Sequence, residues 1–299
     1  MMNTTDRSAL ITVRDLIRYG VTRLNAAQVS FGHGSDNAWD EAVYLVLHAL
    51  HLPPDTLDPF LDARLLPEER ARILDLLDRR VHERLPAPYL TNEAWLRGRR
   101  FFVDSRVIVP RSPIAELLDD GLAPWVADPE QVENVLDMCT GSGCLAVLSA
   151  LAFPCAHVDG VDVSASALEV AVHNVEAYNL QHRVSLHLSD LFTQLPPREY
   201  DVIVCNPPYV NQASMSALPA EYRHEPGLAL AGGNDGMDLV RHILRDAPGH
   251  MKPGGLLVLE IGHERAHFEA AFPRLEPVWL DSEAASDQIL LLTREQMLS

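Results

Sequence analysis

Residues 134–147 read NVLDMCTGSGCLAV, and this stretch decides the fold. It predicts a buried strand over Asn134–Met138, a tight turn of small residues, and a helix that begins near Cys144. Glycines at 141 and 143 allow the backbone to approach a ligand closely, and the first turn of a helix has free N–H groups. A turn of this kind fits a dinucleotide or phosphate site as well as a nucleoside site. The neighbouring strands distinguish between these ligands.

The next expected strand, residues 157–163, carries Asp162 near its end, about twenty positions after the glycine-rich turn. In a nucleoside-binding βαβ unit, a carboxylate at this place accepts hydrogen bonds from both ribose hydroxyls. A third strand, Val184–Leu188, precedes Asp190 and Leu191, in position to border an adenine ring. No Gly-Lys-Ser or Gly-Lys-Thr follows the glycines, which argues against a P-loop. The pattern predicts an α/β fold with a parallel sheet.

A second motif, Asn206-Pro207-Pro208-Tyr209, follows the apolar strand expected over residues 201–205. The Asn side-chain oxygen and a neighbouring backbone carbonyl can each accept one N–H from a planar amide or an exocyclic amine. The prolines remove competing donors and stiffen the turn, and the Tyr ring offers a flat stacking face. Pro-Pro is also an ordinary strand terminator, and Asn can cap a turn. Together with the glycine-rich turn, the motif favours a site for an amino nitrogen that is not basic.

In this order the motifs resemble those of class I S-adenosylmethionine-dependent methyltransferases, which have a Rossmann-like seven-stranded sheet. From about Ala38 to Thr293 the chain resembles the bacterial protein-glutamine N5-methyltransferases, the HemK/Prm group. Residues 109–118, VPRSPIAELL, resemble the branch that modifies the third protein of the large ribosomal subunit. The sister branch, which acts on peptide release factors, typically carries Pro-Arg-Pro-Asp-Thr-Glu there and Gly in place of Cys139.

The resemblance implies S-adenosyl-L-methionine as the cofactor and methylation of a glutamine side chain as the activity. The residues expected to bind the cofactor are Asp137, Cys139, Thr140, Gly141, Ser142, Gly143, Asp162, Asp190, Leu191 and Asn206. The residues expected to bind the substrate are Asn206, Pro207, Pro208 and Tyr209, with Asn206, Pro207 and Tyr209 as the catalytic residues.

Asn206 Oδ1 and the Pro207 carbonyl are expected to accept the two N–H groups of the amide, and Tyr209 to stack on the amide plane. Asp137 is expected either to orient the glycine-rich turn or to meet the cofactor ammonium. Glu260, near the end of a strand expected over residues 256–261, is interpreted as support for the edge of the core rather than as a catalytic residue.

Three domains are expected along the chain. Residues 1–88 show apolar positions at spacings of three and four, which predicts a helical domain, and the resemblance gives it a role in substrate recognition. Residues 89–110 form a connector that a β-hairpin would fit, and residues 111–299 form the catalytic domain. Residues 288–292 are expected as a final edge strand. Residues 221–226 are expected on a long loop that covers the substrate.

Composition bounds the remaining possibilities. With 299 residues, of which 47% are hydrophobic, the chain can form a large α/β core and a small second domain. No apolar run reaches the roughly 18 residues of a membrane span, and no signal-peptide pattern is present. The four cysteines lack metal-site spacing and the 13 histidines form no cluster, so reduced thiols, a cytoplasmic location and no metal are predicted. The resemblance implies a bacterial protein.

Charge is distributed unevenly. Residues 1–100 carry 13 Arg and 14 Asp or Glu, so that 17 of the 18 net negative charges fall on residues 101–299. An acidic domain repels phosphate backbones and favours a basic partner, here a ribosomal protein, free or in an assembly intermediate. Acidity that serves only solubility is an equal reading.

Several interpretations stay open from the sequence. A local basic stretch could touch rRNA or form a solvated hairpin face, and the second is favoured; it comprises Arg97, Arg99, Arg100, Arg106 and Arg111. Alternative activities are release-factor glutamine methylation, methylation of a nucleic-acid amine, and a cofactor-binding scaffold without turnover. The acidic domain disfavours the nucleic-acid substrate, and the intact motif at residues 206–209 disfavours the scaffold.

Overall fold

The structure, a computed structural model, describes residues 7–282 and 286–299. Its chain packs into two compact units. The first comprises Met1–Glu93, described from residue 7 onward, together with Pro219–His224, and the second comprises Ala94–Leu218 and Glu225–Ser299. Residues 1–6 of the expected helical domain and 283–285 of the expected catalytic domain lie outside the described residues. The expected division at residue 88 did not include the segment Pro219–His224, and the roles assigned to the domains stay predictions.

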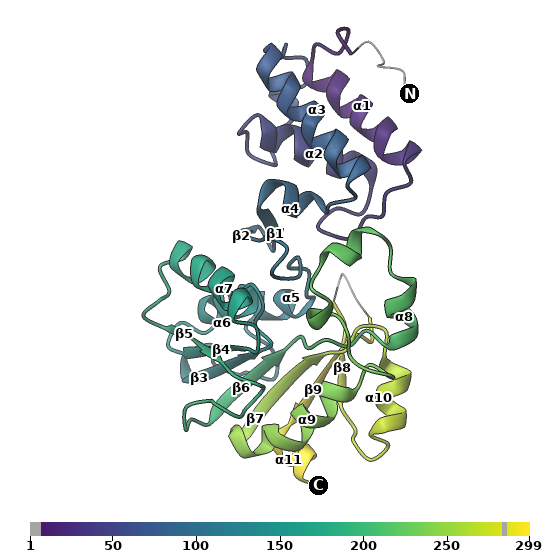
Figure 1. The fold of residues 1–299 in the computed structure, drawn as a ribbon. Helices are drawn as coiled ribbons and strands as arrows, with labels where there is room; N and C mark the ends of the chain where they lie inside the picture. The colour runs from purple at the N-terminus through teal and green to yellow at the C-terminus, as the bar shows by residue number, and fades with distance from the viewer. Residues whose placement is uncertain (1–6, 283–285) are drawn as a thin grey trace. The chain divides into compact units, whose positions relative to one another are not determined.

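Three helices build the first unit: α1 (Val13–Ala26), α2 (Ala38–Ala49) and α3 (Pro67–His82), followed by the short α4 (Ala87–Thr91). They lie side by side in Figure 1. Thr12 caps α1 in a capping box with Asp15, and Pro67 occupies the first position of α3, where its missing N–H costs no hydrogen bond. Apolar residues at helical spacing, such as Leu16, Leu45 and Leu77, are fully buried between the helices.

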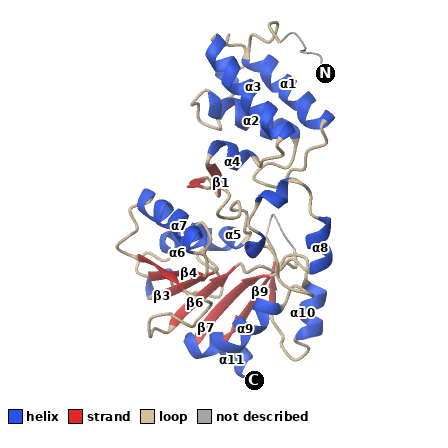
Figure 2. Ribbon diagram, viewed as in Figure 1, coloured by secondary structure: helices blue, strands red, loops and turns tan. Residues whose placement is uncertain are grey.

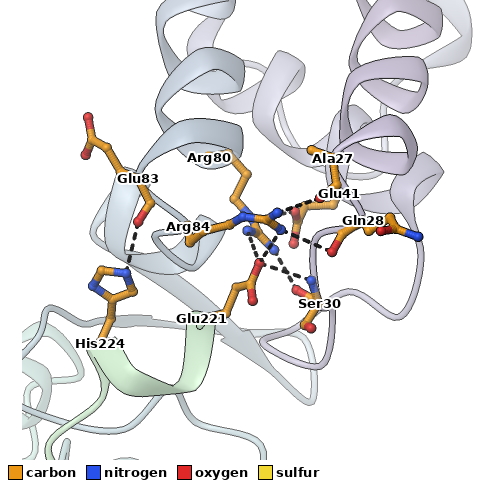
Figure 3. Close-up of polar contacts among 9 residues, drawn as sticks. All are labelled: Ala27, Gln28, Ser30, Glu41, Arg80, Glu83, Arg84, Glu221 and His224. Atoms are coloured by element: carbon orange, nitrogen blue, oxygen red, sulfur yellow. Dashed lines mark hydrogen bonds and ion pairs between the residues drawn. The ribbon is translucent and has the colours of Figure 1, made fainter. Parts of the chain in front are cut away.

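The first unit also contains a buried ionic cluster around Glu221, in the short 3-10 helix η3 (Glu221–His224) (Figure 3). Glu221 Oε1 accepts hydrogen bonds from Arg80 at 3.2 Å, from Arg84 at 3.2 Å and from the backbone N–H of Ser30 at 3.0 Å. Arg80 is 1% exposed and also donates to Glu41 at 2.7 Å. Because a buried charge is tolerated only when it is paired, this cluster fixes Pro219–His224 to the helices.

The long loop expected over residues 221–226 is divided at its middle, and its role as a lid over the substrate stays a prediction. Residues 221–224 belong to the first unit, whereas Glu225 and Pro226 belong to the second. Sequence patterns gave no sign of this division, because the partners of Glu221 lie more than 130 positions away along the chain.

A two-stranded hairpin of β1 (Glu93–Leu96) and β2 (Arg99–Phe102) begins at the boundary between the units and precedes the seven-stranded sheet of the second. The sheet has the order β5-β4-β3-β6-β7-β9-β8 and confirms the predicted fold class. Its strands are β3 (Asn134–Met138), β4 (His157–Asp162), β5 (Val184–Leu188), β6 (Tyr200–Cys205), β7 (Met251–Glu260), β8 (Val278–Leu280) and β9 (Ile289–Thr293).

The expectation that residues 288–292 form an edge strand is wrong. β9 lies between β7 and β8 and runs antiparallel to both, whereas the parallel pairs extend from β5 to β7. Its four apolar residues Ile289–Leu292 are all buried, as a central strand requires. The edge strand on this side of the sheet, β8, has three residues, too few to show a hydrophobic period.

Helices cover both faces of the sheet (Figures 1 and 2). On one face Val135 and Val202 pack with α5 (Ile114–Asp119), α6 (Cys144–Ala152) and α7 (Ala165–Ala177). On the other, Leu136 and Ile203 pack with α9 (Asp238–Asp246) and α10 (Arg265–Ala271). The alternation along each strand is the two-residue period of a sheet buried on both sides. The remaining elements are α8 (Gln212–Ala217), α11 (Arg294–Leu298), η1 (Asp58–Phe60), η2 (Pro129–Gln131), η4 (Gly227–Ala229) and η5 (Ala247–His250).

Candidate active site

A cavity of about 260 Å³ opens in the second unit where β3, β4 and β6 end. Parallel strands of an open α/β sheet bring their carboxyl ends together, and ligands bind there. The cavity is lined by seven of the predicted site residues: Cys139, Gly141, Asp162, Asp190, Leu191, Asn206 and Pro208. The other six, Asp137, Thr140, Ser142, Gly143, Pro207 and Tyr209, do not line it and lie in the surrounding structure.

The glycine-rich turn is folded tightly by three residues in the left-handed region, Cys139 at φ 61°, Gly141 at φ 54° and Gly143 at φ 76°. Thr140 N–H donates to the Val161 carbonyl at 2.8 Å, which fastens the turn to β4. At Gly143 a Cβ atom would lie 3.0 Å from Ala171 Cβ. Close packing of the turn against α7 therefore needs a glycine at this position as well as the unusual backbone angle.

Asp137 lies beneath the turn with no exposed surface. Thr140 Oγ1 donates to its Oδ2 at 2.5 Å, whereas Oδ1 has no hydrogen-bond partner within residues 7–282 and 286–299. Burial raises the pKa of Asp137 to about 7, and the Thr140 hydrogen bond opposes that rise. Of the two roles that the sequence left open, this position favours orientation of the turn.

Asp162 faces the cavity and is tied to the backbone on both sides. Its Oδ2 accepts from Gly141 N–H at 2.9 Å, and its Oδ1 accepts from Ser164 N–H at 2.8 Å. Burial raises its pKa, while these backbone donors oppose the rise. Each carboxylate oxygen can accept a second hydrogen bond, so the side chain is fixed in place and can still receive two hydroxyl groups.

Asn206 follows β6, whose last residue, Cys205, pairs with Met138 of β3. Its side chain lines the cavity, and no hydrogen bond holds its amide within the described chain. Pro208 also lines the cavity, and Pro207 is buried behind it. The turn thus places Asn206 and Pro208 at the wall of the cavity.

Tyr209 is held differently from the other residues of the motif. Its hydroxyl donates to Glu260 Oε1 at 2.8 Å, and burial raises its pKa well above the usual value. A Cβ atom on Gly262 would lie 2.4 Å from Tyr209 Cε2, so the ring rests directly against the Gly262 backbone.

The sequence did not predict the apolar part of the lining, which includes Ile108, Pro226, Leu228 and Leu239. Pro226 belongs to the expected lid, and η4 carries Leu228, whose side chain is 64% exposed. In the sequence, only the apolar character of Leu228 in a loop could have indicated this part of the cavity. Single apolar residues are common on protein surfaces, so this one does not identify a site.

Other kinds of site find no support in the described ranges. Among residues 7–282 and 286–299, no group of three or more His, Cys, Asp or Glu side chains is arranged to hold a metal ion. In the same part of the chain, no helix has the length and apolar character that crossing a membrane requires. All four cysteines are free thiols.

Comparisons with known proteins agree with this geometry. The family model "Methyltransferase small domain" matches residues 119–221. A Bordetella pertussis protein named ribosomal protein uL3 glutamine methyltransferase is 75% identical over 296 residues, covering 99% of both chains. Proteins of the same name are 58% identical in Burkholderia pseudomallei, over 98% of both chains, and 53% identical in Neisseria gonorrhoeae, over 97% of this chain and 96% of that one.

Proposed function

The chain belongs to the family of ribosomal protein uL3 glutamine methyltransferases, and on that premise we propose that it methylates the side-chain nitrogen, N5, of a glutamine in uL3. Membership rests on matches that cover nearly the whole chain at 53 to 75% identity. The relatives carry the substrate in their name, which favours uL3 over a release factor.

S-adenosyl-L-methionine is the methyl donor, and it supplies a methyl group activated by a sulfonium centre. The residues around the cavity suit it. Asp162 can receive the ribose hydroxyls, and the turn at Cys139–Gly143 can hold the methionine part through its backbone. Asp190 and Leu191 line the cavity on the side that we assign to the adenine.

The acceptor is the difficult partner in this reaction. The lone pair of an amide nitrogen is delocalised into the carbonyl, so that a glutamine side chain is a weak nucleophile. Positive charge develops on the nitrogen as its bond to the methyl carbon forms and the carbon–sulfur bond breaks. Asn206 Oδ1 and the Pro207 carbonyl can stabilise that charge by accepting the two N–H groups, which also aligns the nitrogen with the methyl group. One proton then leaves the nitrogen.

The single observation that carries this proposal is the state of Asn206. A polar side chain at the end of a central strand lines the cavity beside the turn at Cys139, and its amide is not used by the rest of the described protein. An amide that only capped a turn would bond to the backbone near it.

The basic stretch around residues 97–111 gives little support for a contact with ribosomal RNA. Arg97 and Arg99 both pair with Asp119, at 2.6 and 3.1 Å, and Arg106 pairs with Asp104 and Glu169. Carboxylates that pair with these arginines offset part of their charge and weaken their attraction for phosphate. The solvated hairpin face is thus the better reading of this stretch, and an acidic domain suits a basic ribosomal protein.

The direct test incubates the purified protein with S-adenosylmethionine and unmethylated uL3, with a release factor and ribosomal RNA as competing acceptors. We expect one added methyl group on one glutamine of uL3, located by peptide mass spectrometry. Asn206→Ala should lower turnover at least tenfold, while calorimetry should give a cofactor affinity within a few-fold of the wild type.

Asn25→Ala, the same change on the exposed face of α1, is the matched control and should be neutral. Methyl transfer to the release factor or to RNA in preference to uL3 would contradict the proposed substrate. An Asn206→Ala protein that loses cofactor affinity and turnover equally would contradict the proposed role of Asn206.

A further inference from the structure

Glu260 is a buried carboxylate at the end of β7, with only 4% of its surface exposed. Both of its oxygens are used: Oε1 accepts from the Tyr209 hydroxyl at 2.8 Å, and Oε2 accepts from Ser112 Oγ at 2.5 Å. The nearest positive charge is Arg111, which pairs with Glu225 and also lowers the pKa of Glu260 against the rise that burial causes. A buried carboxylate is costly, and its only direct hydrogen-bond donors in the described chain are two hydroxyl groups, so Glu260 depends on Ser112 and Tyr209 for its solvation.

The place of Glu260 in the sheet links it to the turn Asn206–Tyr209, which we call the methyl-acceptor turn. β6 pairs with β7 in parallel, and Cys205 lies opposite Leu259. Asn206 and Glu260 are the next residues on the two strands and therefore lie side by side where these strands end. Starting from Asn206, the turn ends at Tyr209, and Tyr209 bonds back to Glu260. The carboxylate closes the turn onto the adjacent strand.

Glycines make this closure tight. The Tyr209 ring rests against Gly262, two residues beyond Glu260, where a Cβ atom would lie 2.4 Å from Cε2 and 2.9 Å from Cζ. A Cβ on Gly232 would lie 2.6 Å from Tyr209 Cα. The segment after the turn is fixed as well, because Val210 N–H donates to the Leu230 carbonyl at 2.8 Å. Packing at Gly262 and Gly232 thus confines the Tyr209 ring, and the Glu260 contact adds a directional tie at its hydroxyl.

Ser112 connects the same carboxylate to the segment at residues 109–118. Its neighbour Arg111 donates to both oxygens of the buried Glu225, at 2.6 and 2.8 Å, and Glu225 directly precedes the cavity residue Pro226. Two consecutive residues therefore hold two carboxylates. Arg111 holds Glu225, next to the cavity residue Pro226, and Ser112 holds Glu260, next to the methyl-acceptor turn.

We propose that Glu260 is a positioning residue for methyl transfer: held by Ser112, it fixes Tyr209 through its hydroxyl and so sets the position of the turn that grips the acceptor amide. This inference rests on the proposed function, since it assigns a role relative to that acceptor. Misplacement of a reacting group by about 1 Å can cost on the order of a hundredfold in rate, so a tie of this kind affects turnover more than binding.

The test compares three single variants and one double variant by turnover on uL3. Glu260→Gln preserves both contacts, because its oxygen can accept from Tyr209 and its amide can donate to Ser112, so its kcat should stay within about threefold of the wild type. Glu260→Ala and Tyr209→Phe each remove the tie and should lower kcat about tenfold or more, with unchanged cofactor affinity. The double variant should be no slower than the slower single variant.

Two results would overturn the proposal. One is a Glu260→Gln protein as slow as Glu260→Ala, which would make the negative charge itself the important property. The other is additive losses in the double variant, which would mean that Glu260 does not act through Tyr209. Glu130→Ala, a carboxylate removed from an exposed position, is the matched control and should match the wild type.

A spectroscopic measurement separates this inference from the proposed function. The 13Cζ resonance of Tyr209, identified by its absence in Tyr209→Phe, is sensitive to donation of the phenol proton to a carboxylate. It should move in Glu260→Ala and stay in place in Glu130→Ala. An unmoved resonance would overturn the tie whatever the activity. A moved resonance in a protein that transfers no methyl group to uL3 would support the tie and contradict the proposed function.

Discussion

Asp137 and Asp162 stand at the ends of neighbouring parallel strands, and their surroundings give the two carboxylates different properties. Asp137 has one hydroxyl donor and full burial, whereas Asp162 has two backbone donors and a face on the cavity. The sequence could place both at strand ends, because the apolar runs before them are clear. It assigned Asp162 to the ribose but left two roles open for Asp137, since its exposure depends on how the turn at Thr140 folds over it.

Asp162→Ala should raise the dissociation constant of S-adenosylmethionine at least tenfold, measured by calorimetry. The change removes the expected ribose acceptor and also releases the ties to Gly141 and Ser164. At saturating cofactor, kcat should stay within about threefold, because the acceptor turn at Asn206 is untouched. Asp55→Ala, at an exposed position, serves as the control. Unchanged cofactor affinity would rule out the ribose role.

Asp137 should make stability depend on pH. Its pKa is about 7 in the folded protein against 3.8 as the ordinary value, so the folded state binds more protons between these values. Its contribution to the free energy of unfolding is thus fully present below about pH 4 and is lost as the pH rises toward about 7.

Asp137→Asn removes this titration. The free energy of unfolding of the wild type, relative to the variant, should therefore fall by up to about 3 kcal/mol between about pH 5 and about pH 8, in urea titrations. The control Asp55→Asn should leave the difference constant. A wild type and Asp137→Asn protein with parallel pH profiles would show that the carboxyl group is not buried as described.

At the level of elements, the strands that build the site were the most predictable part of the fold. β3, β5 and β6 agree with the predicted ranges to within one residue, because each is a short apolar run bounded by a turn signal. The strand β8 and the helix η3 escaped prediction for a different reason. Both are too short to show a period. The position of η3 also depends on Arg80, which lies 141 residues before Glu221.

Helix α6 depends on the conformation of Gly143, which caps it at φ 76°. Gly143→Ala should lower the free energy of unfolding by about 2 kcal/mol, because alanine is strained in this region and its Cβ would press on Ala171. Cofactor affinity should fall as well, since the turn must shift. Gly249→Ala is the matched control, because a Cβ there meets nothing within 4 Å. Equal stabilities of the two variants in urea titrations would contradict this account.

For the whole molecule, the uneven charge predicts the response to salt. Residues 101–299 carry nearly all of the net charge of −18, and a basic substrate is attracted to them over a distance that salt shortens. Raising NaCl from about 50 mM to about 300 mM should lower kcat/KM for uL3 about tenfold, mainly through association.

Over the same range, the affinity for the small cofactor should change little, which makes cofactor binding the internal control. A kcat/KM that does not depend on salt would mean that the acidity serves only solubility, the equal reading that the composition left open.

The segment Pro219–His224 has a consequence for how the protein can be divided or inherited. Deleting residues 1–93 would leave Glu221 in the chain and remove Arg80 and Arg84, its buried partners. Exchange of the N-terminal region between two relatives by recombination would likewise join a Glu221 from one parent to arginines from the other. The helical part therefore cannot be exchanged at a single junction. Substitutions in it must remain compatible with the six residues Pro219–His224, which the second half of the gene encodes.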